Sequence, residues 1–169
     1  MLLFADGDGA STFSDVDLLI ERLVDVSIGS RKHPVVRNGI CVAEAKAQRG
    51  LLRLLLMQVF HLLVLYVMQI VVFGGVSIED TQCGFKLFTR QAAQELFGQL
   101  HLERWIFDVE LLYLSNRLGL DVQQVGIEWH EVPGTNLSLV RDSAQMLVQL
   151  LMMRTYYLVG WWRVAKKDV

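Results

Sequence analysis

The chain has 169 residues, enough for one domain of ordinary size, and 53% of them are hydrophobic against 20% charged, which excludes intrinsic disorder for most of it. A formal net charge of −2 argues against a general nucleic-acid-binding protein, and two cysteines cannot form a disulfide scaffold. The mean hydropathy of +0.36 is high for a soluble domain and indicates a membrane or a large partner surface.

The charges divide the chain into three different surfaces. Residues 1–25 carry six acidic residues and one basic residue, whereas residues 31–53 carry six basic residues and one acidic residue. From residue 141 onward there are five basic residues and two acidic ones, together with several aromatic residues. We therefore expect an acidic start, a basic arm and a basic, aromatic tail.

The first five residues, MLLFA, form a short apolar run that stops at Asp6-Gly7-Asp8-Gly9. A signal peptide would begin with a basic region and have a longer apolar stretch. The run instead predicts a buried strand of a parallel sheet. Because a central strand is an unusual beginning, we expect the complete fold to start upstream, with this chain a fragment, a short isoform or a product of a misassigned start.

Three elements are expected next. Ser14-Asp15 can cap a helix that runs to about Leu23, and residues 24–28 alternate as a second strand. Residues 32–50 are polar with one apolar patch, and they predict a loop or lid.

Residues 54–78 form a stretch of 25 residues without a charged side chain. Spanning a membrane takes about 20 apolar residues, so the stretch qualifies by length. Its polar residues Gln58, His61 and Gln69 share roughly one helical face, which suits a helix that lies in an interface or faces a site. We favour an interfacial or core helix and keep a membrane span as the alternative.

The remaining chain predicts a strand after Gly84, helices over residues 91–100 and 103–118, and a strand over residues 122–129. Pro133-Gly134 turns the chain, and a final helix runs from Ser143 to about Val164.

Two carboxylates that follow an apolar strand are the first candidate site. Asp6 and Asp8, two residues apart at a carboxyl end, can together hold a hard divalent cation such as Mg²⁺ or Mn²⁺. A cation there would neutralise a diphosphate and help it leave. The alternative is an ordinary polar Asp/Gly turn, because a D-x-D pattern alone is weakly specific.

The basic arm is the second candidate site. Arg31 follows a strand and Gly29-Ser30, and Arg49 and Arg53 lie four residues apart, on one face if they are helical. Guanidinium groups suit bidentate phosphate binding. A solvated basic face beside a membrane is the alternative, and both hold if the phosphate sits at a lipid surface.

Two later segments contain further candidates. Asp80 precedes a tight glycine turn and can act as a base or hold sugar hydroxyls, and Lys86 can face a phosphate; turn chemistry and an edge strand are the alternative. Asp108 lies on an apolar helical face, which is costly for a carboxylate unless it is paired or functional. A structural ion pair with Arg104 or Arg117 is the competing account.

The order of six motifs carries a resemblance to a known family. The motifs are FADGDGA (residues 4–10), Gly29-Ser30-Arg31, Gln48-Arg49 with Arg53, Leu56-Met57 with Phe60-His61 and Val64, DTQCGFKLFTR (residues 80–90) and ERWIFDVELLYL (residues 103–114). Together they resemble the dolichyl-phosphate β-glucosyltransferases, a branch of the inverting family 2 glycosyltransferases. The resemblance covers nearly the whole chain but only the later part of the family's domain.

The resemblance implies an α/β fold of the GT-A type, Rossmann-like and N-terminally truncated here. It implies an enzyme at the endoplasmic reticulum membrane with its active site on the cytoplasmic face. The implied reaction transfers glucose from UDP-glucose to dolichyl phosphate and gives dolichyl β-D-glucosyl phosphate and UDP for N-glycan assembly. We expect residues 1–140 to form the partial GT-A domain and residues 141–169 an amphipathic, membrane-associated helix with a basic tail.

By the family pattern, Asp6 and Asp8 would hold Mg²⁺ or Mn²⁺ on the diphosphate of UDP-glucose. The cations near the donor diphosphate and the acceptor phosphate would be Arg31, Arg49, Arg53 and Lys86. Asp80 and Asp108 would be the catalytic carboxylates, and Glu110 would lie with Asp108 in the helix beneath the active site.

Two other functions stay open from the sequence. One is a relative that transfers mannose from GDP-mannose to dolichyl phosphate. The other is a truncated, non-catalytic protein that only associates with a membrane. No nucleic-acid partner is expected.

Overall fold

The computed structural model describes residues 1–37, 40–43, 58–59, 62, 78–130, 132 and 139–165. Arg49, Arg53 and most of the segment 54–78 lie outside these residues, so their predicted roles are not addressed by the structure. Within the described residues, no helix is long and apolar enough to cross a membrane.

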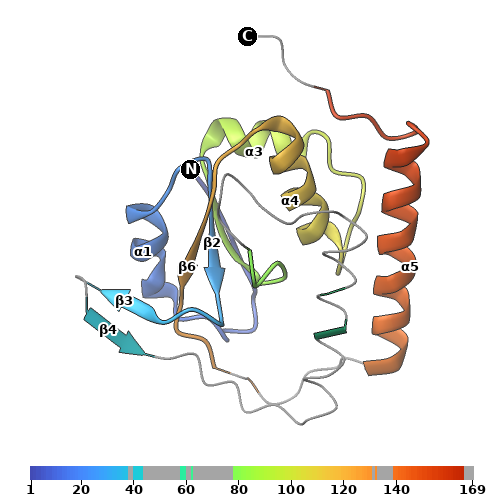
Figure 1. Cartoon of the computed structure of the whole chain (residues 1–169). Coiled ribbons are helices and arrows are strands. Elements are labelled where there is room, and N and C mark those ends of the chain that lie inside the picture. The colour runs from blue at the N-terminus through green and yellow to red at the C-terminus, as the bar shows by residue number, and fades with distance from the viewer. Residues whose placement is uncertain are drawn as a thin grey trace.

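A four-stranded sheet forms the centre of the fold (Figure 1). Its strands are β1 (Leu2–Ala5), β2 (Val26–Ser30), β5 (Phe85–Phe88) and β6 (Val122–Gly126), in the order β1-β5-β2-β6. Strands β2 and β6 are parallel, whereas β5 is antiparallel to both β1 and β2. The expected α/β class is confirmed in this mixed form.

The prediction that the first strand is buried in a parallel sheet was wrong. Strand β1 pairs antiparallel with β5, from Leu2 opposite Phe88 to Ala5 opposite Phe85. In the described part of the chain it lies at one end of the sheet, and its residues are exposed or half-buried. The apolar run predicted a strand correctly, but a run of this kind says nothing about which strand lies beside it.

The segment predicted as a loop or lid contains a second, two-stranded sheet. Strands β3 (Val35–Arg37) and β4 (Ile40–Ala43) pair antiparallel as a hairpin. Alternation is hard to read here because each strand has only three or four residues. The hairpin lies beside the end of β6, where the backbone of Pro34 closely approaches Gly126.

The helices follow the sequence predictions with shifted ends. They are α1 (Val16–Glu21), α3 (Arg90–Phe97), α4 (Phe107–Leu118) and α5 (Leu139–Leu158). Thr89 caps α3, since its hydroxyl accepts a hydrogen bond from the Ala92 N–H at 3.2 Å. Helix α4 begins later than predicted because Arg104 has a positive φ of 66° in the preceding turn.

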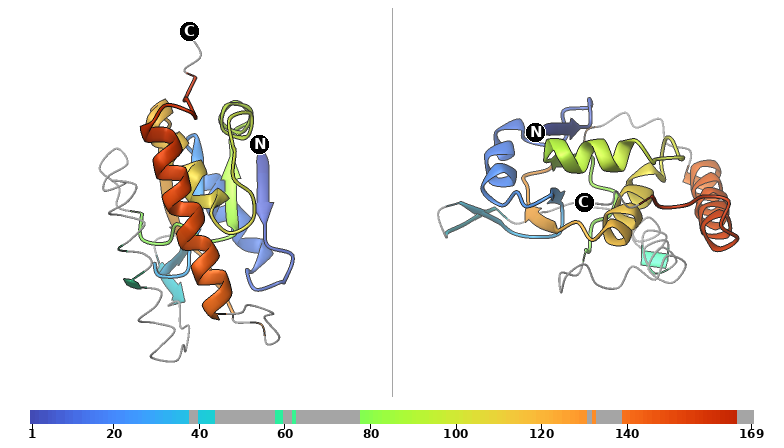
Figure 2. Two further views of the ribbon diagram at one scale, coloured as in Figure 1. Left: turned by 90° about the vertical axis from the view of Figure 1, so that its right-hand side faces the viewer. Right: turned by 90° about the horizontal axis from the view of Figure 1, so that it is seen from above.

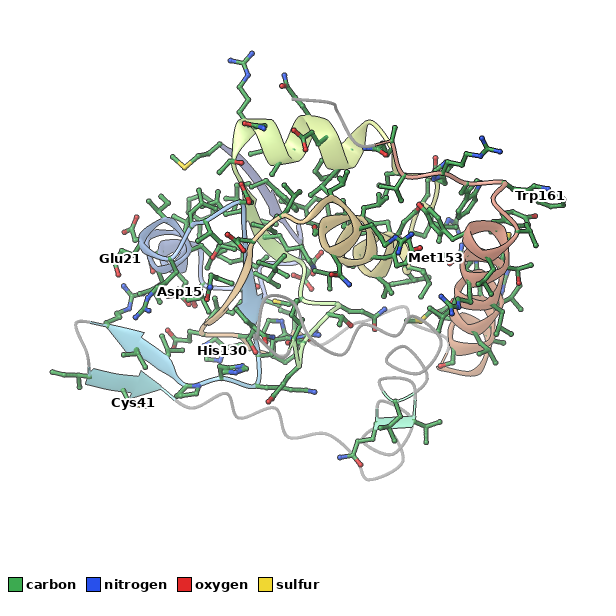
Figure 3. The ribbon with its side chains drawn as sticks, turned by 45° about the horizontal axis from the view of Figure 1, so that its top comes forward. Asp15, Glu21, Cys41, His130, Met153 and Trp161 are labelled. Atoms are coloured by element: carbon green, nitrogen blue, oxygen red, sulfur yellow. The ribbon has the colours of Figure 1, made fainter. Side chains whose placement is uncertain are left out.

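Asp15 does not cap α1 with its side chain, contrary to the prediction. Its buried carboxylate instead accepts hydrogen bonds from the Arg37 guanidinium at 2.5 Å and the Glu128 N–H at 2.6 Å. It thereby ties α1 to the hairpin and to the chain that follows β6, and Figure 3 shows it beside α1. The last predicted strand also ends early, at Gly126.

The helices cover both faces of the sheet. Seen from above in Figure 2, α1 lies on one side, and α4 and then α5 lie on the other. Strands β2 and β5 bury Ile28 and Phe85 against this cover, and α5 contributes Leu150 and Met153, none of them more than 1% exposed. Figure 3 shows Met153 pointing from α5 toward the core.

We expect Gly126→Ala to destabilise the fold. A Cβ at this position would lie 2.1 Å from the Pro34 carbonyl oxygen, so the backbone of the hairpin would have to move. Forced displacement of this kind costs about 1–3 kcal/mol. Urea unfolding measures the loss, with Gly7→Ala as the control because open space surrounds Gly7. Equal unfolding midpoints for the two variants would contradict the packing described here.

Candidate functional site

The candidate site lies where the carboxyl ends of β1, β2 and β6 meet. Because β5 runs the other way, its amino end and the loop before it reach the same edge of the sheet. Asp6 follows β1, Arg31 follows β2, and Asp80 and Gly84 precede β5. The sheet thus brings together residues that lie up to 78 positions apart, and His130 marks the same edge in Figure 3.

An ion pair between Arg31 and Asp80 organises this edge. The Asp80 carboxylate accepts hydrogen bonds from the Arg31 backbone N–H at 2.9 Å, from Nε at 2.8 Å and from Nη2 at 2.6 Å. Burial alone would raise the pKa of Asp80, but the hydrogen bonds and charge of Arg31 bring it below its ordinary value. Asp80 is therefore an ionised anchor for the guanidinium and a poor proton acceptor.

A second ion pair lies deeper, between Lys86 and Asp108. The Lys86 side chain is 1% exposed, and its Nζ donates to Asp108 Oδ1 at 2.8 Å and to the carbonyl of Cys83. Burial raises the pKa of Asp108, and the charge of Lys86 opposes that shift. Neither of the arginines considered from the sequence is the partner of Asp108.

These contacts bear on the phosphate role expected for Lys86. Its ammonium faces protein groups in the interior, so in this arrangement it supports β5 and α4 and does not reach a ligand. The structure thus favours a positioning role for Lys86 and for Asp108.

The Asp6–Asp8 turn lies at the surface beside both ion pairs. The Asp6 N–H donates to the Gly84 carbonyl at 2.9 Å, and the Asp6 carboxylate lies directly over Gly84, where a Cβ would come within 2.0 Å of it. Partial burial and then the charge of Asp8 raise the pKa of Asp6, whereas Lys86 and Arg31 lower it. Asp8 Oδ1 accepts from the Ala10 N–H at 3.0 Å, which closes the turn.

The chemistry of this turn fits a hard divalent cation. Two neighbouring carboxylates repel each other, here shown by the part of Asp8 in raising the pKa of Asp6, and a positive charge between them relieves the repulsion. In the part of the chain that the structure describes, no group of three or more His, Cys, Asp or Glu side chains gathers as a metal centre. A cation at Asp6 and Asp8 would thus complete its coordination with ligand oxygens or water.

Glu110 and Asp108 lie on opposite faces of α4, contrary to the expectation that both lie beneath the active site. Two positions apart on a helix are about 200° apart around its axis, so the two carboxylates face opposite ways. Glu110 is fully buried toward α5, where it accepts hydrogen bonds from Tyr157 Oη at 2.8 Å and the Leu102 N–H at 2.7 Å. It therefore connects α4 to α5 and lies outside the candidate site.

Trp129 belongs to the site, and sequence reasoning treated it only as the end of a strand. The Arg31 Cζ lies 5.7 Å from the centroid of the Trp129 ring, within the range of a cation–π contact. The sequence contained one signal for this role of Trp129, a tryptophan within a polar stretch close to the end of a strand.

Comparison with known proteins identifies relatives over nearly the whole chain. It is 43% identical over 173 residues to the "Dolichyl-phosphate beta-glucosyltransferase" of Saccharomyces cerevisiae, covering 98% of this chain and 50% of that protein. The proteins of the same name from Drosophila melanogaster and Homo sapiens are 44% and 41% identical, covering 97% and 98% of this chain and 49% and 50% of those proteins. No family model matches the chain, and no solved structure matches it significantly.

The resemblance expected from the sequence motifs is thus confirmed, since proteins named dolichyl-phosphate beta-glucosyltransferase align with nearly all of this chain. The chain spans about half the length of the curated relatives it matches.

We expect the Arg31–Asp80 pair to make stability depend on pH in the acidic range. The folded-state pKa of Asp80 is lowered, and the unfolded value is about 3.9, so the ionised pair stabilises the fold above about pH 4. This contribution is lost as the pH falls through the folded-state pKa. Urea unfolding of the wild type and of Asp80→Asn should therefore give free energies whose difference is constant near pH 6 and begins to shrink as the pH falls below about 4.

Asp17→Asn is the control for this measurement, because Asp17 is exposed on α1 and makes no ion pair with Arg31. A difference between wild type and Asp80→Asn that stays constant from pH 6 to pH 3 would contradict an ionised pair.

Proposed function

We propose that the protein transfers glucose from UDP-glucose to dolichyl phosphate, giving dolichyl β-D-glucosyl phosphate and UDP for N-glycan assembly. One observation carries the proposal: relatives 38–44% identical over nearly the whole chain bear the name of this activity. The mixed sheet with a D-x-D turn at its carboxyl edge is compatible with a GT-A domain, of which this chain would be a part.

The arrangement of charges supports this chemistry. The attacking group would be a phosphate oxygen of dolichyl phosphate, which is already ionised at neutral pH, so no strong general base is required. The difficulty is to bring two anions together, and preorganised cations solve it by electrostatic stabilisation. Arg31, held in place by Asp80, supplies such a fixed positive charge at the edge of the sheet.

Asp6 and Asp8 would hold Mg²⁺ or Mn²⁺ at the donor. When bound, the metal would neutralise the diphosphate and stabilise the departing UDP. The task of the chain's own residues is to orient this turn: Gly84 leaves room for the Asp6 carboxylate, and the Ala10 N–H fixes Asp8. Asp80 would act through Arg31 and not as a base, which changes the role expected from the sequence.

The acceptor would be presented at the endoplasmic reticulum membrane, with the site on its cytoplasmic face. Helix α5, the outermost helix in Figure 1, carries an exposed apolar stripe at helical spacing. The stripe and its continuation comprise Leu147 (36% exposed), Val148 (64%), Leu151 (48%), Leu158 (66%), Val159 (58%) and Trp161 (74%). Apolar and aromatic residues of this kind, followed by the basic Arg163, suit the surface of a lipid bilayer.

We expect Asp6→Asn and Asp8→Asn each to reduce glucosyl transfer by at least about 100-fold, because either change removes one anionic oxygen that would hold the metal. Transfer to dolichyl phosphate is measured with Mn²⁺ and with UDP-glucose or GDP-mannose as donor. The exposed Asp17→Asn serves as the matched carboxylate control and should retain wild-type activity.

The donor comparison separates the functions that the sequence left open. Transfer from UDP-glucose alone supports the proposal, and transfer from GDP-mannose alone would replace it with mannosyl transfer. Full activity in both aspartate variants would contradict the metal assignment. If membrane binding persists while neither donor is used, the chain is a non-catalytic membrane-associated protein.

We expect Leu151→Asp to weaken binding to lipid vesicles about five- to tenfold, because it places a carboxylate in the middle of the apolar stripe. Co-sedimentation with phosphatidylcholine vesicles that contain phosphatidylinositol measures the change. Gln94→Asp adds the same charge to an exposed position on α3 and should leave binding unaltered. Equal binding of the two variants would exclude the outer face of α5 as the lipid-facing surface.

A further inference from the structure

A short segment after β6 joins the two parts of the candidate site. Residues 127–130, called here the bridging segment, run from the end of β2 to the turn that follows Asp6 and Asp8. Its backbone contacts are Ile127 N–H to the Ser30 carbonyl at 3.1 Å, Thr12 N–H to the Glu128 carbonyl at 3.0 Å, His130 N–H to the Ala10 carbonyl at 2.8 Å, and an antiparallel bridge between Ser11 and Trp129. The segment is therefore fixed to both the strand before Arg31 and the carboxylate turn.

Trp129 lies in the middle of this segment, and its side chain adds a contact to Arg31. The guanidinium is bound along one edge by Asp80, through Nε and Nη2, while its Cζ lies 5.7 Å from the centroid of the indole. Edge binding fixes the guanidinium within the plane that it shares with the carboxylate. A ring near the guanidinium limits movement out of that plane.

The remaining amino group of Arg31, Nη1, is not engaged by Asp80. The Arg31 side chain keeps 22% of its surface exposed, so an anion at the edge of the sheet can reach it. The direction in which Nη1 points toward such an anion depends on how firmly the plane of the guanidinium is held. It also depends on the distance between that plane and the carboxylate turn, which the bridging segment sets.

We propose that Trp129 is a positioning residue for phosphate binding, which holds the Arg31 guanidinium at a fixed place relative to Asp6 and Asp8. The proposal rests on the proposed function for the identity of the ligand, a nucleoside diphosphate with a divalent cation. Its structural part, the restraint of Arg31 by the indole, is independent of any ligand. The Trp129 side chain contributes the restraint, while its backbone bridge to Ser11 survives substitution.

The first test observes Arg31 directly by NMR in the 169-residue chain without a ligand. In Trp129→Leu we expect the Arg31 Nε–H to exchange with water about three- to tenfold faster than in the wild type, because the hydrogen bond to Asp80 opens more often. Trp129→Phe keeps an aromatic ring and should stay within about twofold of the wild type. Trp161→Leu removes an exposed indole elsewhere and should leave the exchange unaltered.

The second test adds a ligand. Binding of UDP in the presence of Mn²⁺ should weaken about three- to tenfold in Trp129→Leu, while binding of Mn²⁺ alone stays unchanged because Asp6 and Asp8 are intact. Faster exchange together with weaker UDP binding supports the whole proposal. Faster exchange in a chain whose wild type does not bind UDP supports the positioning role and counts against the proposed function.

Unchanged Arg31 exchange in Trp129→Leu overturns the proposal, even if that variant is less stable or less active. Should Trp129→Leu fail to fold, the wild type itself decides. The Arg31 side-chain protons, close to the indole, should then resonate at a different position from those of the exposed Arg22, and random-coil positions for both would overturn the proposal.

Discussion

The ion pair between Arg31 and Asp80 is the interaction on which the arrangement of this edge depends. Asp80 is buried, and a buried carboxylate without a partner would be strongly destabilising. Its hydrogen bonds to the backbone and the side chain of Arg31 join the end of β2 to the loop before β5, 49 residues later. The same pair that stabilises the buried charge therefore fixes a guanidinium at the surface, beside Asp6 and Asp8.

The other charges of the site follow from this constraint. The Lys86–Asp108 pair lies in the interior, so of the two ion-paired cations Arg31 is the more exposed, at 22% of its side chain, and Lys86 is buried, at 1%. Both cations lower the pKa of Asp6 against the opposing effects of burial and Asp8. The turn keeps an excess of negative charge near a fixed cation, an arrangement that suits a divalent metal together with an anionic ligand.

The sequence predicted most of the local elements, but it did not predict how the strands pair or which side chains meet at the site. Local patterns in the sequence indicated strands β1 and β2, helices α3 and α4, and the D-x-D turn. These features depend on apolar periodicity and capping, which act over a few residues. The antiparallel course of β5, the hairpin at residues 35–43 and the exposed position of β1 depend on which strands pair, and a period-2 pattern does not encode a neighbour. The partners of Asp80, Asp108 and Trp129 are likewise set by tertiary contacts. The roles predicted for Arg49 and Arg53 remain predictions, because both residues lie outside the part of the chain that the structure describes.

The central claim is that Arg31 and the carboxylate turn act as one site for a nucleoside diphosphate with its metal. Electron paramagnetic resonance of Mn²⁺ tests it, by measuring Mn²⁺ affinity with and without UDP in the wild type and in Arg31→Gln. The account predicts that UDP tightens Mn²⁺ binding to the wild type and that this coupling is lost in Arg31→Gln, while Mn²⁺ binding without UDP is retained. Equal coupling in both proteins, or its absence from the wild type, would contradict the account.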